Sequence, residues 1–554
     1  MFGLGFGIGK FRRWGVGIGG FTSTIYVNQT GGSDTNDGLT SSTPLQTLAA
    51  IPLQNGMRIY LARGSVWHEE LDTSAYTGVW IDAYGSGSLP VLDASDTAPA
   101  TWVVDGANNK VYNQTLSHSG DIGLYLSIWE NGVRPKWVAS KALCQATPGT
   151  FTVGVSTLGS NIFSIHPLGD TNPASDGKVY TYSARNYGLL LGANSTVNYI
   201  RTRKQIHNNG STVMGANCVA NFCIFEDGVK HNTFGSVGCI YNDCIAWKSD
   251  WIIRENHTSF VAFQPTITSG EVTFNRCVSL MELTVLQDAL ARGTDSTGFY
   301  AHTDGAPGHV WSTINYNQCS TKNNGTGFSV ADTILVSSTR CHPETSNSGF
   351  SFNGTTNNVI DPWVNETDGI KVNRAITSLV DGALNIDGAR VYTIIGGDAQ
   401  LYDPGTTGTL NLTRSVFYKA ADSNYQYLVR GFGGRTVNMD HCILFGDQTS
   451  ADVAALKALT PGAIDVNLYG GSINLDYEIE ANSYSNFAAY RVGYPALDPN
   501  SQALAFGVST GLVDPANGDF HLTPDSPAAL MGAGVLRPDA VYTAIPSHAT
   551  VAAM

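Results

Sequence analysis

Hydrophobic residues occur along most of this chain in short runs, rich in β-branched and aromatic side chains, which Gly and Asn interrupt. Such runs are typical of short β-strands separated by tight turns. Cys218 and Cys223 recur 21 residues later as Cys239 and Cys244. A period near 21 residues is too short for a propeller blade, and the leucine-rich consensus is missing from the repeats. The pattern therefore predicts an all-β parallel β-helix, built from three-strand coils of about 21 residues each with loop excursions.

Two polar or small residue types recur in register with this repeat. An Asn-x-Cys motif begins at four positions, and amides stacked at one turn can bond to the coils above and below. These positions are Asn221, Asn242, Asn275 and Asn317. The cysteines that we expect to stack as small buried residues are Cys223, Cys244, Cys277, Cys319 and Cys341. No Cys-x-x-Cys pair occurs, so neither a zinc site nor a redox site is expected.

The repeat also predicts which apolar residues point into the helix on the strand after each cysteine. These residues are Val229, Ile252, Phe299, Phe328 and Phe350. The spacing from Cys277 to Phe299 is longer than in the other coils, which predicts an insertion at about 281–296. A second insertion is expected at about 256–271. Residues 450–459 are predicted to form a short capped helix.

Composition narrows the classes of ligand. The chain has 554 residues, a formal net charge of −14 and only 14% charged residues. Its polar surface must therefore come largely from uncharged side chains, which suit the binding of sugars. The chain also lacks the excess of Lys and Arg that nucleic-acid binding requires. In residues 1–20 the basic residues follow the apolar run, so we expect no secretory signal there. Frequent glycine in the same segment argues against membrane insertion.

Several motifs resemble those of pectin-lyase-fold proteins. They are TIYVN at 24–28, GGSD at 31–34, NDG at 36–38, TPLQTL at 43–48, AYGSG at 83–87, PVL at 90–92 and GDFHLTPDSP at 518–527. The resemblance spans roughly residues 24 to 535. It implies a right-handed parallel β-helix, a fold that hosts lyases, hydrolases, epimerases and non-catalytic binders.

The start of the chain is similar to the starts of some phage tail proteins. It reads MFGLGFGIG at 1–9 and KFRRWG at 10–15. The resemblance to a bacteriophage tailspike, or polysaccharide depolymerase, implies a homotrimer in the virion that acts at the host cell surface. We accordingly expect four regions. They are a virion-attachment segment at 1–23 that binds a tail or baseplate protein, a cap with the first coils at 24–190, a central β-helix with a glycan cleft at 191–480, and a closing segment at 481–554.

The expected register places one group of side chains on the outer surface of neighbouring coils. With Ile252 and Phe299 inward, strand alternation turns Glu255 and His302 outward into one column. The candidate catalytic residues are Glu255, Asp304, His302 and Lys230, and the candidate substrate-binding residues are Arg254, Trp251, Tyr300 and Trp311. The two insertions would flank this column and form a cleft.

Two reactions remain open at such a site. Hydrolysis of a glycosidic bond needs two carboxyl groups, which Glu255 and Asp304 would supply. Elimination across a uronic acid needs a base beside a group that neutralises the carboxylate, which Lys230, Arg254 and His302 would supply. No cofactor or metal is expected. Calcium at the acidic set of Glu226, Asp227 and Asp250 is the alternative.

These observations favour a phage tailspike or tail fibre protein that binds and depolymerises bacterial surface polysaccharide, as a lyase or a glycoside hydrolase. A non-catalytic glycan-binding adhesin or structural tail component is the first alternative. A bacterial polysaccharide lyase is the second. Incubation with host polysaccharide separates cleavage from binding alone.

Overall fold

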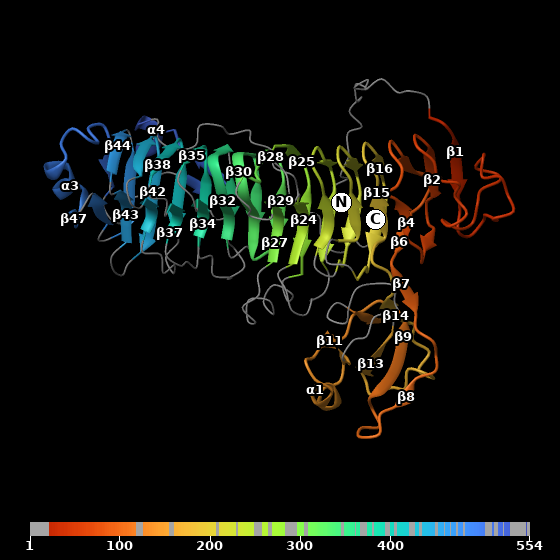
Figure 1. Cartoon of the computed structure of the whole chain (residues 1–554). Coiled ribbons are helices and arrows are strands. Elements are labelled where there is room, and N and C mark those ends of the chain that lie inside the picture. The colour runs from red at the N-terminus through yellow and green to blue at the C-terminus, as the bar shows by residue number, and fades with distance from the viewer. Residues whose placement is uncertain are drawn as a thin grey trace.

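Short strands that pair in parallel from coil to coil build a right-handed parallel β-helix in the computed structural model, which confirms the predicted fold class (Figure 1). The helix is an elongated rod, and a smaller unit projects from its side (Figure 1). The structure describes residues 21–117, 126–154, 160–206, 210–228, 231–248, 257–263, 269–282, 296–303, 308–344, 348–360, 362–365, 374–378, 382–393, 399–403, 407–419, 427–431, 435–448, 453–458, 460–465, 467–472, 475–479, 482–504, 512–514, 519–524, 526–531, 550 and 554.

The strands of successive coils form three ladders, here called faces one, two and three, that follow one another along the chain in each coil. Face one consists of β4 (Leu71–Thr73), β15 (Leu189–Leu191), β18 (Thr212–Met214), β21 (His231–Gly235), β24 (His257–Phe263), β27 (Ser296–His302), β30 (Thr326–Thr339), β32 (Ser348–Ile360), β34 (Arg374–Ser378), β37 (Ala399–Asp403), β40 (Tyr427–Gly431), β43 (Val453–Ala458) and β46 (Leu475–Ile479). The long strands β30 and β32 continue from face one into face two.

Face two consists of β1 (Thr24–Val27), β2 (Arg58–Ala62), β5 (Trp80–Tyr84), β16 (Thr196–Asn198), β19 (Val219–Asn221), β22 (Ile240–Asn242), β25 (Glu271–Asn275), β28 (Trp311–Asn317), the later halves of β30 and β32, β35 (Gly382–Asp387), β38 (Gly408–Thr413), β41 (Thr436–Asp440) and β44 (Thr460–Asp465). Face three consists of β3 (Val66–Trp67), β6 (Val91–Asp93), β17 (Arg201–Arg203), β20 (Ile224–Glu226), β23 (Ile245–Lys248), β26 (Val278–Met281), β29 (Ser320–Lys322), β31 (His342–Glu344), β33 (Trp363–Asn365), β36 (Arg390–Thr393), β39 (Val416–Lys419), β42 (Ile443–Gln448), β45 (Leu468–Ser472) and β48 (Gln502–Ala503).

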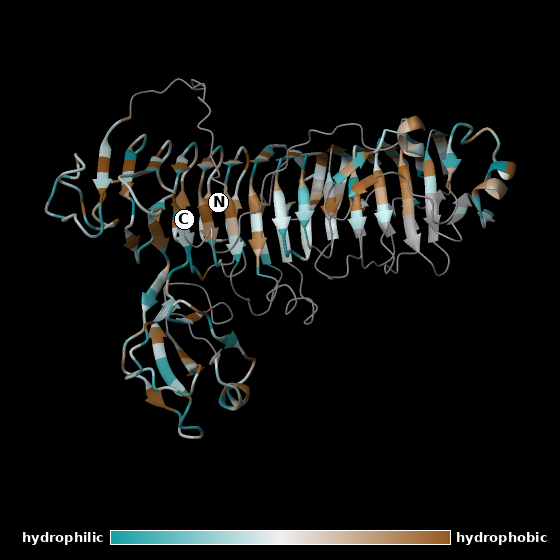
Figure 2. Cartoon of the chain, turned by 180° about the vertical axis from the view of Figure 1, so that it is seen from behind, coloured by the Kyte–Doolittle hydropathy of each residue, from teal (hydrophilic) through white to brown (hydrophobic). Residues whose placement is uncertain are grey.

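Alternation along each strand sends one side chain into the rod and the next one outward. Figure 2 shows the result as hydrophobic and hydrophilic positions mixed on the strands along the rod. The inward residues of all three faces merge into one apolar cluster that runs from Ile25 to Tyr490. Burial of this continuous column, in which each coil covers its neighbours, stabilises the rod.

A stack of phenylalanine rings fills the interior behind face one. The rings of Phe260, Phe299, Phe328 and Phe350 follow one another at centroid distances of 4.8, 5.0 and 5.1 Å and are nearly parallel. All four side chains are fully buried, which confirms the inward prediction for Phe299, Phe328 and Phe350. The ladder partner of Phe299 on the preceding coil is Phe260 and not Ile252, which corrects the expected register. Both Val229 and Ile252 lie outside the described residues.

The cysteine and asparagine columns are present as predicted. All five cysteines are buried, and each Sγ lies 3.3–3.7 Å from a backbone carbonyl oxygen of the coil before it. The amide of each asparagine donates to the side-chain oxygen of the one before, at 2.8 Å for Asn242 to Asn221 and 2.9 Å for Asn275 to Asn242. The next residue is left-handed in each of these coils, with φ of 54° at Phe222 and 53° at Asp243. The column therefore marks the tight corner between faces two and three.

The asparagine column also measures how much chain each coil contains. Asn242 follows Asn221 by 21 residues, Asn275 follows Asn242 by 33, and Asn317 follows Asn275 by 42. The expected extra residues in these two coils are thus confirmed. Much of the predicted insertion at 256–271 is strand, however, because β24 lies within it. Of the segment at 281–296, residues 283–295 lie outside the described residues.

The prediction of a helix at 450–459 is wrong. Val453–Ala458 is strand β43, which pairs in parallel with β40 and β46. The pairing with two neighbouring coils outweighs the helix propensity of its Ala, Leu and Lys residues.

Residues 94–184 form a separate unit between two adjacent coils, which the sequence did not lead us to expect. β6 pairs directly with β17, so the rod continues as if this segment were absent. The unit, here called the inserted unit, has its own apolar core around Phe151 and Phe163. Its elements are β7 (Ser95–Thr97), β8 (Val103–Val104), β9 (Tyr112–Ser117), β10 (Ile128–Glu130), β11 (Lys136–Trp137), α1 (Lys141–Ala146), β12 (Thr150–Val153), β13 (Ser160–His166) and β14 (Tyr180–Ser183).

The first elements after β46 cover the far end of the rod. β47 (Asn482–Tyr484) pairs antiparallel with β46, and α3 (Phe487–Gly493) stacks Tyr490 on Tyr477 at 5.0 Å. β49 (Leu512–Asp514), β50 (Asp519–Leu522) and α4 (Pro527–Met531) follow. The carbonyl of Met554 accepts a bond of 3.0 Å from the backbone N–H of Leu89, so residue 554 lies beside the early coils. Among the described residues, no helix has both the length and the apolar character of a membrane span.

Candidate functional site

Three of the eight predicted site residues are described, and all three lie on adjoining strands. Tyr300 and His302 belong to β27, and Trp311 begins β28. Lys230, Trp251, Arg254, Glu255 and Asp304 lie outside the described residues, so their places at the site stay predictions.

His302 and Tyr300 point to the outer surface of face one, as predicted, because they alternate with the buried Phe299 and Ala301. Their rings stack at a centroid distance of 4.4 Å and an interplanar angle of 16°. The Nδ1 atom of His302 lies 2.9 Å from the carbonyl oxygen of Thr303, to which an Nδ1–H donates. This bond fixes the ring orientation and, when the imidazole is neutral, selects the tautomer in which Nε2 is the acceptor.

Two phenylalanines that the sequence analysis did not select extend this aromatic surface. Phe263 is the ladder partner of His302 on the preceding coil, and the two rings lie 4.6 Å apart. Phe234, one coil earlier, contacts Phe263 edge-on at 5.5 Å. All four side chains are half-buried. We call the group formed by Phe234, Phe263, Tyr300 and His302 the aromatic platform.

The platform has a different register from the one expected. The sequence predicted Glu255 beside His302, but Phe263 takes that position. The cause is extra chain before β24, because Trp247 and Thr258 are 11 residues apart where their ladder partners Glu226 and His231 are 5 apart. The sequence did contain a signal for this register. Phe260 and Ala262 are two positions apart and can both point inward on a strand, which leaves Phe263 pointing outward.

Trp311 has a structural place in this region. It is fully buried, which leaves its indole no exposed face for a sugar and corrects the expectation that it binds substrate. Its Nε1–H donates to the carbonyl oxygen of His302 at 3.1 Å. Trp311 therefore holds the end of β27, where His302 lies, in a defined position.

Polar side chains lie on the outer side of face two in the same coils. Glu271 is exposed at the start of β25, and Thr273 follows on the same side. The amide of Asn315 in β28 donates to the Thr273 hydroxyl at 3.3 Å. Carboxylate, hydroxyl and amide groups of this kind bond to sugar hydroxyls.

A buried charged network occupies the corner where the chain passes from face three to face one. Arg203 binds Asp93 at 2.6 Å, and Arg201 pairs with Glu226. Burial works against the charge on Asp93, but Arg203 and Lys204 hold the pKa of this carboxyl below its usual value. Burial and the neighbouring Asp227 raise the pKa of Glu226.

Asp93 and Glu226 are thus each paired with an arginine at this corner. In the part of the chain that the structure describes, no group of three or more His, Cys, Asp or Glu side chains could hold a metal ion. Glu226 and Asp227, two members of the acidic set considered for calcium, are described, and Asp250 is not.

Comparison with known proteins gave structural matches alone. No family model matches the chain, and no curated protein matches it. A solved structure described as the complex of XylC with xylose covers 88% of this chain and 87% of its own, at 11% identity and a TM-score of 0.39. The match to a GH136 lacto-N-biosidase from Eubacterium ramulus covers 87% of this chain and 67% of the lacto-N-biosidase chain, at 12% identity and a TM-score of 0.27. The match to a structure described as a glycoside hydrolase covers 90% of this chain and 99% of the other chain, at 8% identity and a TM-score of 0.29. Because each of these three TM-scores is below 0.5, no activity is transferred from these structures to the chain.

Proposed function

We propose that this chain binds bacterial surface polysaccharide along the outer surface of its β-helix, with the aromatic platform as the central contact. The observation that carries the proposal is the platform itself, four half-buried rings from three consecutive coils. Aromatic rings offer large apolar faces, on which the C–H faces of sugar rings stack.

The dimensions of the platform fit an extended glycan. Coils repeat at about 4.8 Å, so rings on three coils cover about 10 Å along the rod. This length is comparable to that of a disaccharide unit. Glu271, Thr273 and Asn315 on face two would bond to the hydroxyls of such a chain. The low overall charge suits a ligand recognised through stacking and neutral hydrogen bonds.

The biological setting that we propose is a phage tailspike. The supporting observations are the resemblance of residues 1–15 to phage tail proteins and the parallel β-helix, an architecture that the resemblance implies for tailspikes. In this setting residues 1–23 attach the protein to the tail or baseplate, and three copies associate. Removal of residues 1–20 should leave a soluble β-helix that binds glycan but no longer joins the particle. Incorporation of the truncated protein into virions would overturn the attachment proposal.

Binding is tested with purified full-length protein immobilised on a biosensor and polysaccharide extracted from candidate host bacteria. Phe263→Ala and Tyr300→Ala should each weaken binding by about tenfold, which corresponds to about 1.4 kcal/mol of lost stacking. The matched control is Ile334→Ala, which removes an exposed apolar side chain of β30 outside the platform. Equal affinity in all four proteins, for a polysaccharide that the wild type binds, would show that the platform is not the site.

Cleavage is a second candidate function, which the anchored His302 favours. A neutral imidazole whose Nδ1 is held by a carbonyl group presents Nε2 as a base, as elimination requires. In that reaction the base takes the proton at C5 of a uronate, and the bond from C4 to the leaving oxygen breaks to give a C4–C5 double bond. A new ultraviolet absorbance would report this product, whereas a shortened polysaccharide without it would indicate hydrolysis by Glu255 and Asp304. Binding with no change in chain length would indicate the adhesin alternative.

A further inference from the structure

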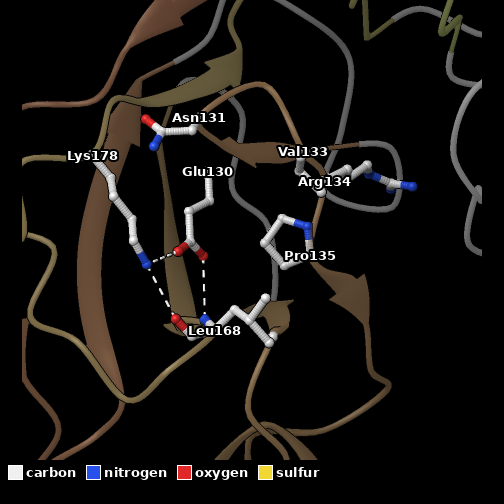
Figure 3. A pocket seen from close by; sticks show the side chains of 8 residues that line it. Glu130, Asn131, Val133, Arg134, Pro135, Leu168 and Lys178 are labelled. Carbon is white, nitrogen blue, oxygen red and sulfur yellow. Dashed lines mark hydrogen bonds and ion pairs between the residues drawn. The ribbon is translucent and has the colours of Figure 1, made fainter.

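The inserted unit contains a pocket of about 310 Å³ (Figure 3). None of the four residues of the aromatic platform lines it. A hairpin turn at Asn131 and Gly132, with φ of 48° and 79°, forms one side of the pocket. Asn-Gly is the favoured sequence for a tight turn with both residues left-handed, so the local sequence accounts for this wall. The pocket is lined by Glu130, Asn131, Val133, Arg134, Pro135, Gly149, Leu168 and Lys178.

The rim of the pocket is apolar and unusually exposed. Val133 is 72% exposed and Leu168 is 69% exposed, although both are large hydrophobic side chains. Figure 3 shows Leu168 directed toward the ring of Pro135. These two side chains offer an apolar contact at the rim to a ligand with an apolar face.

The polar end of the pocket holds the ion pair of Lys178 and Glu130, with Asp176 3.7 Å from the Lys178 ammonium group. Arg134 also lines the pocket, and its guanidinium group is directed away from this pair (Figure 3). The ammonium group of Lys178 forms an ion pair with Glu130, and it also donates to the carbonyl oxygen of Leu168 and the hydroxyl of Thr171, each at 3.1 Å. An ammonium group has three N–H donors, so these three acceptors occupy all of them. An anionic ligand therefore finds no available donor on Lys178.

Glu130 keeps hydrogen-bonding capacity. One of its oxygens binds Lys178, and the other accepts a long bond of 3.3 Å from the backbone N–H of Leu168. A carboxylate offers about four lone-pair sites, so acceptors remain for hydroxyl groups of a ligand. Because Lys178 pairs with Glu130 and the cationic Arg134 also lines the pocket, a cationic ligand gains little over a neutral one.

These features specify a small neutral ligand with one apolar face and several hydroxyl groups. We propose that the pocket of the inserted unit is a second glycan site, which binds one neutral sugar residue through Val133, Leu168 and Glu130. The volume of about 310 Å³ lies at the small end of the range for ligand pockets. The choice of a sugar among neutral polyols rests on the proposed function of the platform.

Two contacts hold the inserted unit against the rod. Asp96 forms an ion pair of 2.7 Å with Arg185 near the point where the chain returns to the rod. The Lys204 ammonium group, at the corner of the rod, lies 4.8 Å from the ring centre of Trp129 in the inserted unit. A second site at a fixed place raises the affinity for a polymer beyond that of either site alone.

Saturation-transfer NMR on the full-length chain tests the proposal, with glucose, galactose, mannose and N-acetylglucosamine as separate probes. At least one probe should receive saturation at its ring C–H protons from the wild type. The double variant Val133→Ala, Leu168→Ala should weaken that binding about tenfold. Both side chains are exposed, so the variant should keep the wild-type thermal midpoint. The matched control is Ile162→Ala, which is 53% exposed on β13 of the same unit and does not line the pocket.

The outcomes separate this site from the platform. Binding by the wild type that is lost in Tyr300→Ala and kept in the double variant would overturn the pocket proposal and leave the platform intact. Saturation of no probe by the wild type would overturn it as well, and the polysaccharide measurement above would then decide the platform separately. A change in oligomeric state in the double variant without a change in sugar binding would show that the apolar rim is a protein contact, which also overturns the proposal.

Discussion

Phe263 and His302 lie opposite each other on adjacent coils, with their ring centroids 4.6 Å apart. This pair determines the character of the candidate site, because it puts an apolar ring where the repeat had predicted the carboxylate of Glu255. The outer surface of face one is therefore an aromatic surface at the end of β24 and β27. A surface of stacked rings is suited to holding a sugar chain, and any carboxylates that act on the chain must come from the segments beside it.

The catalytic prediction concerns Glu255 and Asp304. If they are the carboxyl pair of a glycosidase, Glu255→Gln and Asp304→Asn should each lower the rate of cleavage by at least about a hundredfold. Glycan binding should change little, because the aromatic platform is untouched. Product release from host polysaccharide, measured by size-exclusion chromatography, gives the rate. A double variant with full activity would rule out this carboxyl pair.

The phenylalanine stack behind face one makes a prediction about stability. Phe299→Ala should lower the free energy of unfolding by about 3–5 kcal/mol, because Phe299 contacts the rings of Phe260 and Phe328 and a cavity would remain between them. Tyr300→Ala, at the half-exposed neighbouring position, is the matched control and should cost much less. Urea denaturation followed by tryptophan fluorescence measures both. An equal loss of unfolding free energy in the two variants would contradict the inward position of Phe299.

Asp498 predicts a pH dependence of stability at the far end of the rod. The carboxyl is buried, accepts a bond of 2.9 Å from the hydroxyl of Tyr469, and also binds Ser501. Burial raises its pKa from 3.8 to about 6. Between these two values the folded chain binds more protons than the unfolded chain, so stability falls as the pH rises from about 4 to 6, and the loss persists at higher pH. The expected loss is on the order of 3 kcal/mol.

The variant Asp498→Asn should lack the loss of stability that ionisation of Asp498 causes, because an amide does not ionise. Its side-chain oxygen can still accept the bond from the hydroxyl of Tyr469. Thermal midpoints of wild type and variant between pH 4 and 7 should therefore diverge in favour of the variant as the pH rises. Glu271→Gln, at an exposed carboxylate, should follow the wild-type profile. Parallel curves for wild type and Asp498→Asn would exclude the raised pKa.

The cysteine column predicts the reactivity of the thiols. All nine cysteines are buried and unpaired. Burial also raises the pKa values of Cys223, Cys244 and Cys277 well above the usual value, which lowers the fraction of reactive thiolate. A disulfide reagent such as Ellman's should therefore react with none of the thiols in the native chain. After denaturation it should titrate nine. Rapid reaction of even one thiol in the native chain would show that a coil opens.

The sequence by itself determined the parallel β-helix and its interior columns. The asparagine and cysteine spacings report the same corner of each coil, because a tight turn and a narrow interior accept few residue types. The inward places of Phe299, Phe328 and Phe350 followed from the same repeat. These features are local and periodic, so a pattern in one chain is enough to find them.

The tertiary structure decided what the repeat could not specify. Extra residues before β24 shift the register and bring Phe263 to His302, and the length of an insertion carries no signal of where pairing resumes. Trp311 resembles a surface aromatic in sequence, yet the packing of β28 buries it. Residues 94–184 form a separate core because β6 pairs with β17 across them. Each of these results depends on contacts between residues far apart in the chain, and such contacts leave no local pattern by which the sequence could reveal them.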